Sequence, residues 1–442
     1  MSKHYKRIPL LTAAIISLGL TMAGHAYAGD LRQGKQTKQL VEGLYSNNLD
    51  AAAYFQQGVT QYNRSNFKGA ELAFRKALIY DPSIAMAHYL LGNALFQQGQ
   101  TEQASEQYQR ALSLDPRMSE AHYNLGLTLY RQANLDGAIT QYQRALSIDP
   151  TLAPARYNMG LAYEAQGRTD NALMEYTEAI RLNPNYAIAQ YNLGLILAKR
   201  DQSEPAITAL QQAVRSNPEL VEGHYQLGLL LAKQGQLKEA ENALKTATKL
   251  EPKFAPAQYQ LGQVFAQQGN FEAASGRFAW VTTLEPNNVD AYRQLGAALT
   301  KDGQNEEAIV ALQTAVNLQP GDALTHYNMG VALQQEKRYD DAIAQYQEAI
   351  RLNPSLPEAF YNMGIALQQS QRPEEGMSFI VQARNLFSQQ GNLRKIDEVD
   401  RYVQQLTNQP TIPALIQPTL PPQAQPQQPS SPFQTPPNTG TF

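Results

Sequence analysis

Residues 85–118 read AMAHYLLGNALFQQGQTEQASEQYQRALSLDPRM, and the pattern in this stretch decides the fold. Apolar residues recur three and four positions apart on both sides of Gly99, which is typical of two amphipathic helices. Gly99 itself supplies the left-handed backbone conformation that ends a helix. Pro116 then prevents the second helix from running into a third. The stretch therefore predicts two helices joined by a tight turn.

The same pattern returns every 34 residues without an insertion. Glycines mark the period, at Gly58, Gly92, Gly126, Gly160, Gly194, Gly228, Gly262, Gly296, Gly330 and Gly364. Alanines follow twelve residues later, at Ala70, Ala104, Ala138, Ala172, Ala206, Ala240, Ala274, Ala308 and Ala342. Two helix backbones approach closely only where side chains are small, so these positions predict helix–helix contacts. The chain is expected to be all-α, a solenoid of about ten 34-residue helix-turn-helix repeats over residues 51–390.

These residues resemble the tetratricopeptide repeat family, whose units carry Leu-Gly, then Ala, an aromatic residue and Pro at fixed offsets. The resemblance covers about three quarters of the chain. It implies a right-handed superhelix with a concave face lined by the first helix of each unit, and a role as a scaffold or peptide binder. The spelling AHYNLG at residues 121–126 is also similar to the repeats of O-linked N-acetylglucosamine transferases. Their catalytic domain has no counterpart here, so the resemblance does not imply transferase activity.

Both ends of the repeat array depart from the pattern. Residues 391–407 continue as an amphipathic helix, and a solenoid needs a polar-backed cap over its last apolar face. We therefore expect residues 391–407 to form a C-terminal cap and residues 29–50 to form an N-terminal one. Residues 408–442 hold ten Pro and many Gln, which predicts a disordered tail with polyproline II character. This tail is either a spacer or docking segment, or it is dispensable.

Residues 1–28 have the three-part pattern of a secretory signal. Lys3 and Lys6 belong to a basic start, an uncharged apolar run follows, and small residues precede the expected cleavage after Ala28. The alternative, an uncleaved anchor helix, is less favoured because the apolar run is shorter than the roughly 20 residues of a membrane span. We expect an exported protein of a bacterial periplasm, a lumen or the medium, with no stable membrane span after cleavage.

The composition excludes several classes of protein. The chain has no Cys, which rules out disulfides, thiolate metal sites and a Cys nucleophile. Its formal charge of −3 is too balanced for phosphate neutralisation, so no nucleic-acid binding is expected. It carries no serine-hydrolase, phosphate-loop or zinc-protease motif. The sequence therefore predicts a protein that is not an enzyme and that binds no cofactor.

Four histidines occupy one repeat position: His88, His122, His224 and His326. Equivalent positions of neighbouring repeats lie about a helix-packing distance, roughly 10 Å, apart. Zinc needs ligand nitrogens about 2 Å away, so we expect no metal site and interpret these residues as packing between helices.

A row of carboxamides is the main candidate for a binding site. Counting each unit from Ala51, position six carries an amide in nine units, at Gln56, Asn124, Asn158, Asn192, Gln226, Gln260, Gln294, Asn328 and Asn362. Each amide offers donors and an acceptor, so a regular row can hold an extended peptide backbone whatever its side chains. The family resemblance implies that this position faces the concave surface. The alternative is that these amides only cap or solvate the groove.

Aromatic residues form a second candidate surface. Position five is aromatic in nine units, at Phe55, Tyr89, Tyr123, Tyr157, Tyr191, Tyr225, Tyr259, Tyr327 and Tyr361. Position twelve, on the same helix face, is aromatic only at Tyr62, Phe96 and Tyr130, which predicts a narrower N-terminal third of the groove. Our hypothesis is that Tyr62, Tyr89, Phe96, Tyr123 and Tyr130 dock apolar peptide side chains. The alternative is that position-five rings pack on the adjacent unit.

Two further features bear on binding. Position two carries no cation, so the family's clamp for a partner's C-terminal carboxylate is not expected. Cations at position thirteen, Arg131, Lys199, Lys233 and Lys301, attract acidic ligands only weakly at a surface. Trp280, the only Trp, lies on a second helix and is either a local repacking beside Val281 or an exposed partner anchor.

The sequence therefore predicts a non-enzymatic interaction scaffold that binds a partner protein or an extended peptide in the concave groove. Its expected role is that of an assembly factor in a bacterial envelope or a lumen. The alternative is an accessory subunit of an envelope enzyme or of a glycan or polymer secretion complex. Partner, organism and oligomeric state stay open at this point.

Overall fold

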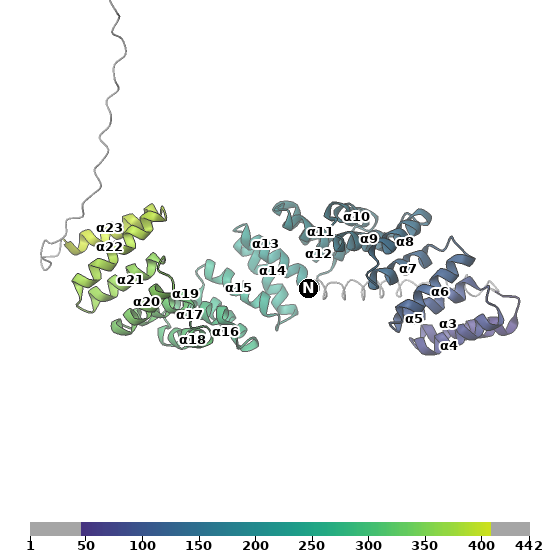
Figure 1. Cartoon of the computed structure of the whole chain (residues 1–442), viewed down its shortest axis with the longest axis horizontal. Helices are drawn as coiled ribbons and strands as arrows, with labels where there is room; N and C mark the ends of the chain where they lie inside the picture. The colour runs from purple at the N-terminus through teal and green to yellow at the C-terminus, as the bar shows by residue number, and fades with distance from the viewer. Residues whose placement is uncertain (1–45, 408–442) are drawn as a thin grey trace, which may run out of the picture. The chain divides into compact units, whose positions relative to one another are not determined.

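The computed structural model describes residues 46–407, which form helices and turns and, within that range, no strand (Figure 1). The predicted all-α fold is confirmed. Residues 1–45 and 408–442 lie outside the described part of the chain, and with them lie the predicted signal, most of the predicted N-terminal cap and the Pro-rich tail. The chain divides into two compact units, of which the first ends at Ala298 and the second begins at Leu299. No helix within residues 46–407 is both long and apolar enough to cross a membrane.

The helices alternate between the first and the second helix of a repeat. The first helices are α3 (Leu49–Asn63), α5 (Ala85–Gln97), α7 (Ser119–Arg131), α9 (Ala153–Ala165), α11 (Ala187–Lys199), α13 (Val221–Lys233), α15 (Ala255–Gln267), α17 (Val289–Asp302), α19 (Ala323–Gln335) and α21 (Pro357–Gln369). The second helices are α4 (Phe67–Tyr80), α6 (Thr101–Leu114), α8 (Leu135–Ile148), α10 (Thr169–Leu182), α12 (Ser203–Ser216), α14 (Leu237–Leu250), α16 (Phe271–Leu284), α18 (Asn305–Leu318), α20 (Tyr339–Leu352) and α22 (Pro373–Gln389). The described part ends with α23 (Leu393–Thr407). Apart from α3, each first helix begins at position one of its repeat.

Within each repeat, the glycine at position eight makes room for the side chain at position 24. A Cβ atom on Gly92 would lie 2.7 Å from Cε1 of Tyr108, well inside van der Waals contact. In the tenth repeat both a side chain and the backbone are close, because a Cβ atom on Gly364 would lie 2.6 Å from Cγ1 of Ile380 and 2.7 Å from the carbonyl oxygen of Gly376. The predicted close packing at these glycines is confirmed, but a ring or a leucine side chain is the nearest group in most repeats.

The tight turn inside each repeat places position fifteen in the left-handed region. The five turn glycines, Gly99, Gly167, Gly235, Gly269 and Gly303, have φ between 75° and 83°, as expected. The other five repeats place Ser65, Ala133, Asp201, Lys337 and Gln371 there, with φ between 56° and 64°. Residues with a Cβ pay an energetic penalty in this conformation. The packing of the two helices therefore imposes the turn even where glycine is missing.

First helices of neighbouring repeats lie side by side. In the first unit α5 contacts both α3 and α7, and α13 contacts both α11 and α15; in the second unit α19 contacts α21. Second helices instead pack on their own first helix and on the first helix of the next repeat, as α4 packs on α3 and α5 and as α20 packs on α19 and α21. The first helices of a unit therefore share one face, which we call the inner face.

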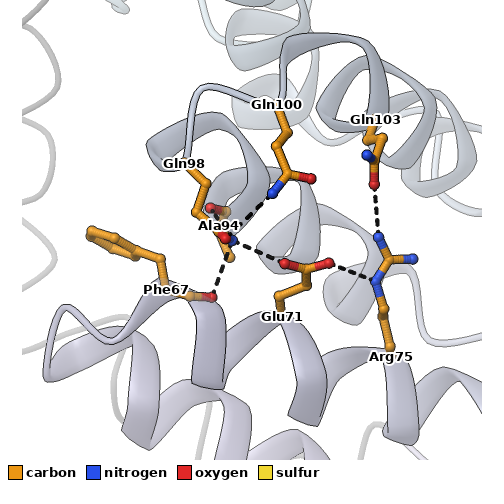
Figure 2. Close-up of polar contacts among 7 residues, drawn as sticks. All are labelled: Phe67, Glu71, Arg75, Ala94, Gln98, Gln100 and Gln103. Carbon is orange, nitrogen blue, oxygen red and sulfur yellow. Dashed lines mark hydrogen bonds and ion pairs between the residues drawn. The ribbon is translucent and has the colours of Figure 1, made fainter.

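Polar side chains near the helix ends tie one repeat to the next (Figure 2). Gln98, which follows α5, donates from Nε2 to the carbonyl oxygen of Phe67 at 3.3 Å and to the carboxylate of Glu71 at 3.2 Å. Glu71 also accepts from Arg75, whose second nitrogen donates to Gln103 at the start of α6. These bonds hold α4 against both helices of the following repeat.

The last helix, α23, covers the end of the last repeat. Val399 on its inward side is fully buried and packs with Ile380 and Phe387 of α22. On the outer side Arg384 forms a bidentate ion pair with Asp400, with Nε 2.5 Å from Oδ1. An apolar face turned inward and a charged face turned outward are what a solenoid cap requires.

Candidate peptide-binding face

Two rows of side-chain contacts cross the inner face. We call the line along which two neighbouring first helices touch a seam, and name it by its helices. The first row joins position five of one repeat to position six of the next, and the second joins position twelve to position thirteen of the next. In both rows the two residues are 35 apart in sequence.

In the first row, the amide at position six donates a hydrogen bond to the tyrosine hydroxyl at position five of the preceding repeat. The Nδ2–Oη distances are 3.2 Å for Asn124 and Tyr89, 3.0 Å for Asn158 and Tyr123, 3.2 Å for Asn192 and Tyr157, and 3.2 Å for Asn362 and Tyr327. Asn158 and Asn192 are each only 3% exposed. Four amides proposed from the sequence as peptide ligands are therefore bonded within their own chain.

At the α11–α13 and α13–α15 seams this row is interrupted. Position six carries Gln226 and Gln260, and neither amide has a hydrogen-bond partner within residues 46–407. Both are half-buried, so their polar groups stand at the inner surface. Burial raises the pKa of Tyr259, and the nearby amides of Gln263 and Gln294 partly offset this rise. Of the two remaining predicted amides, Gln56 is exposed in the first unit and Asn328 is half-buried in the second.

The second row stops at the same place. The guanidinium carbon of Arg131 lies 4.0 Å from the centre of the Phe96 ring, and Nζ of Lys199 lies 3.7 Å from Oε1 of Glu164. Position twelve of the fifth and sixth repeats is Ala198 and Ala232, which offer neither a ring nor a charge. We call α5–α7, α7–α9 and α9–α11 the closed seams, and α11–α13 and α13–α15 the open seams.

Residues of the second helices add to this difference. The Tyr108 hydroxyl donates to Oδ1 of Asn93 at 2.8 Å, and the Tyr176 hydroxyl donates to Oε2 of Glu164 at 2.9 Å. Both phenols are fully buried and reach through the repeat to its inner side. In the fifth and sixth repeats the equivalent residues are Leu210 and Leu244, which carry no polar group. The floor behind the open seams is therefore apolar.

Most position-five rings serve packing. Tyr123 is buried and lies 6.1 Å, centre to centre, from Tyr142 of its own second helix, and Tyr89 is buried in the same way against Tyr108. The two rings proposed from sequence as docking groups are thus inside the repeat, which corrects that placement. The alternative of packing holds, although the partner helix belongs to the same repeat rather than to the adjacent one. Tyr225 is one of the rings that remain half-buried.

The three aromatic residues at position twelve are half-buried on the inner side. Tyr62 makes an edge contact with Phe67 at 5.4 Å, and Phe96 lies beneath Arg131. Burial raises the pKa of Tyr62 and, together with the charge of Glu164, the pKa of Tyr130. Part of each ring remains accessible, and contact with a peptide there stays a prediction.

The histidines at position four hold the loop that precedes their repeat. Nε2 of His88 donates to the carbonyl oxygen of Pro82 at 3.2 Å, and Nδ1 meets Oε1 of Gln107 at 2.8 Å. His122 and His326 repeat this geometry, and His224, whose pKa is lowered by burial, bonds to the carbonyl of Pro218. Their packing role is confirmed. Residues 46–407 contain no cluster of three acidic or histidine side chains suited to a metal ion.

Trp280 is held by a hydrogen bond within its own chain, and its role as a partner anchor stays a prediction. Its indole nitrogen donates to the carbonyl oxygen of Pro252 at 2.9 Å, while 39% of the residue remains exposed. Val281 beside it is fully buried, which supports local repacking of this repeat.

In six repeats the side chains at positions four and 23 of the same repeat contact each other, which the sequence alone did not predict. The pairs are His88–Gln107, His122–Gln141, Arg156–Glu175, Gln258–Arg277, His326–Gln345 and Phe360–Phe379. Each pair joins the two helices of one repeat with matching chemistry, including an ion pair of 3.1 Å between Arg156 and Glu175. A column-by-column comparison of the ten repeats carries only part of this signal, because position 23 is Ala in the other four repeats, even opposite His224.

Family models match most of the repeat array. The model for the C-terminal domain of cilia and flagella-associated protein 70 matches residues 117–326. Two tetratricopeptide repeat models match residues 92–133 and 335–371, and residues 55–104. The fold defines a helical-repeat protein, and with these matches the chain belongs to the tetratricopeptide repeat family. No curated protein sequence matches the chain.

Several solved structures are similar in fold. YrrB, described as a TPR protein with an unusual peptide-binding site, is 23% identical, with 42% of this chain and 96% of that chain covered and a TM-score of 0.40. MamA from Desulfovibrio magneticus RS-1 is 24% identical, with 38% and 96% covered and a TM-score of 0.37. Pseudomonas aeruginosa PilF is 22% identical, with 48% and 96% covered and a TM-score of 0.42.

Proposed function

We propose that this protein is a non-enzymatic interaction scaffold that binds an extended segment of a partner protein on its inner face. The observation that carries the proposal is the pair of half-buried amides of Gln226 and Gln260, which have no partner within residues 46–407. A half-buried amide with no partner in its own chain can exchange a hydrogen bond to water for one to a ligand, with a net gain of about 0.5–1.5 kcal/mol. Carboxamides suit a peptide backbone because each provides donors and an acceptor.

The place of action is part of this proposal. Residues 1–28 have the composition of a secretory signal, which supports an assembly role in a bacterial envelope or a lumen. Mass spectrometry of the protein isolated from its source would test this part. The expected mature chain begins at Gly29, whereas a chain that retains residues 1–28 and stays in the cytoplasm contradicts the proposal.

Photo-crosslinking in the source organism tests the binding face. Benzoylphenylalanine is placed either at Leu229, half-buried on the inner side of α13, or at Gln212, exposed on the second helix α12. We expect covalent partner adducts from the Leu229 variant and none from the Gln212 variant. Adducts from Gln212 alone, or from neither position, contradict binding on the inner face.

A further inference from the structure

We propose that the open seams bind an extended peptide that carries a basic residue next to an acidic one, in a fixed direction along the repeats. This inference deepens the proposed function and rests on it. It follows from three features of α11, α13 and α15: the unpartnered amides, the small apolar floor, and charges of opposite sign on the two sides of that floor.

The amides define the conformation of the occupant. Packed helices lie roughly 10 Å apart, and an extended chain advances about 3.3 Å per residue. Gln226 and Gln260 therefore face backbone groups about three residues apart in the bound segment. A helical ligand would not hydrogen-bond to these amides through its backbone, because its N–H and C=O groups already bond to each other. The amides favour an extended segment.

The floor beneath the segment is small and apolar. Ala198 and Ala232 replace the aromatic and acidic residues found at position twelve of the closed seams. Leu195 belongs to the partly buried apolar residues of the same region, and Leu244 lies fully buried behind it. Apolar residues on either side of the charged pair can cover this floor with their side-chain stems and lose contact with water at little polar cost.

Charges of opposite sign flank the floor. Glu222 lies in the first turn of α13 and Lys233 in its last turn, eleven residues or about 16 Å apart along the helix. Glu222 is half-buried and has no ion pair within residues 46–407. Lys233 reaches Asp201 at 3.4 Å, but both side chains are strongly exposed, so this pair contributes little. Each of the two charges thus remains available to a ligand.

The pattern of the peptide follows from these charges. Successive side chains of an extended chain point to opposite sides. A segment that runs across α11, α13 and α15 therefore presents neighbouring residues alternately to the Glu222 side and to the Lys233 side. A basic residue that points toward Glu222 and an adjacent acidic residue that points toward Lys233 form ion pairs with both charges. The order of these two residues fixes the direction in which the peptide runs.

The test is selection of binders from a random library of 12-residue peptides against the purified protein, followed by calorimetry with each enriched peptide. We expect adjacent basic and acidic residues flanked by apolar ones. The double variant Gln226→Ala, Gln260→Ala should lose at least tenfold in affinity. The matched control Gln211→Ala, Gln212→Ala, with two exposed amides of α12, should stay within twofold.

Exchange of the charges tests the direction. The variant Glu222→Lys, Lys233→Glu should bind the enriched peptides at least tenfold more weakly and should recover affinity for peptides whose charged pair is reversed. If peptides bind tightly and both double variants bind them with unchanged affinity, this inference is wrong, while the proposed function stands. If no peptide is enriched above background, that result contradicts both the proposed function and this inference.

Discussion

The closed and open seams of the first unit are built on the same backbone plan but differ in how their inner faces are used. At the closed seams, Asn158 bonds to Tyr123 and Arg131 covers Phe96. At the open seams, the corresponding residues are Gln226 and Ala198, and neither row of contacts forms. The repeat supplies the helix pairs everywhere, whereas a few inner-face residues decide whether a seam bonds to itself or stays available to a ligand.

This difference implies that the closed seams contribute to stability and that the open seams are available for binding. A hydrogen bond contributes about 1 kcal/mol net, and a cation–π contact about 0.5–1 kcal/mol at an exposed site. The α5–α7 and α9–α11 seams, where both rows form, therefore each gain roughly 1–2 kcal/mol from contacts that the open seams lack, and the α7–α9 seam gains the hydrogen bond of about 1 kcal/mol. This difference in stability can be measured by denaturation of matched variants.

The largest effect is expected at high pH. Burial raises the pKa of Tyr157 and Tyr176 well above the ordinary value of 10. Above pH 10 the unfolded chain loses phenolic protons that the folded chain retains, so the free energy of unfolding falls as pH rises. Each such tyrosine contributes up to about 1.4 kcal/mol per pH unit, and none of this loss occurs below pH 9. Urea midpoints between pH 8.5 and 11.5 measure it.

Single substitutions measure the share of individual tyrosines, since the buried Tyr191 at the α11–α13 seam also has a raised pKa. Tyr157→Phe removes a titrating group at a closed seam and should flatten the decline of stability above pH 10. Tyr225→Phe should flatten it less, because the Tyr225 ring is half-buried and its pKa is raised less strongly. Equal slopes for the two variants would contradict the contrast between the seams.

The second prediction compares matched amides. Asn158→Ala removes two hydrogen bonds, to the Tyr123 hydroxyl and to the carbonyl oxygen of Pro154, and leaves buried acceptors unpaired. We expect a loss of about 1–3 kcal/mol in the free energy of unfolding. Gln226→Ala removes an amide without a partner and should change stability by less than about 0.5 kcal/mol. Urea titration of both variants at pH 7 provides the comparison. Similar losses would show that the Gln226 amide is hydrogen-bonded within the protein and would contradict the open seam.

The third prediction concerns position thirteen and is the smallest. Arg131→Ala breaks the contact with the Phe96 ring and should cost about 0.5–1 kcal/mol. Lys233→Ala, which disrupts only the exposed pair with Asp201, should leave the urea midpoint within error. A larger loss for Lys233→Ala than for Arg131→Ala would reverse the assignment of the two positions.

The fold was predictable from the sequence because local rules act in every repeat. The glycines at position eight and the turn at position fifteen follow from sterics that depend only on the repeat itself. The turn at Asp201 shows the limit of that reasoning, since a non-glycine residue with φ of 56° is held there by the helices on either side. The α23 helix was also expected over the residues that it occupies.

The candidate site was predictable only in part. The sequence reasoning placed the amides on one face, but it treated Asn192 and Gln226 as equivalent members of a row. Whether such an amide is engaged depends on the hydroxyl of the preceding repeat, a contact 35 residues away that no local pattern reveals. Likewise, Tyr123 is buried because the Tyr142 ring packs against it at a tilt, which depends on the geometry of the helix pair.

The central claim is that an open seam binds a ligand because the side chains of its two helices do not bond to each other. A triple variant, Gln226→Asn, Gln260→Asn and Ala198→Glu, gives the open seams the residues of the closed ones: amides for Tyr191 and Tyr225, and a carboxylate for Lys233. The decisive measurement is the affinity of this variant for the selected peptides, with its urea midpoint taken in parallel. The account predicts a higher midpoint together with at least a tenfold loss of affinity. A higher midpoint with unchanged or stronger peptide binding would contradict it.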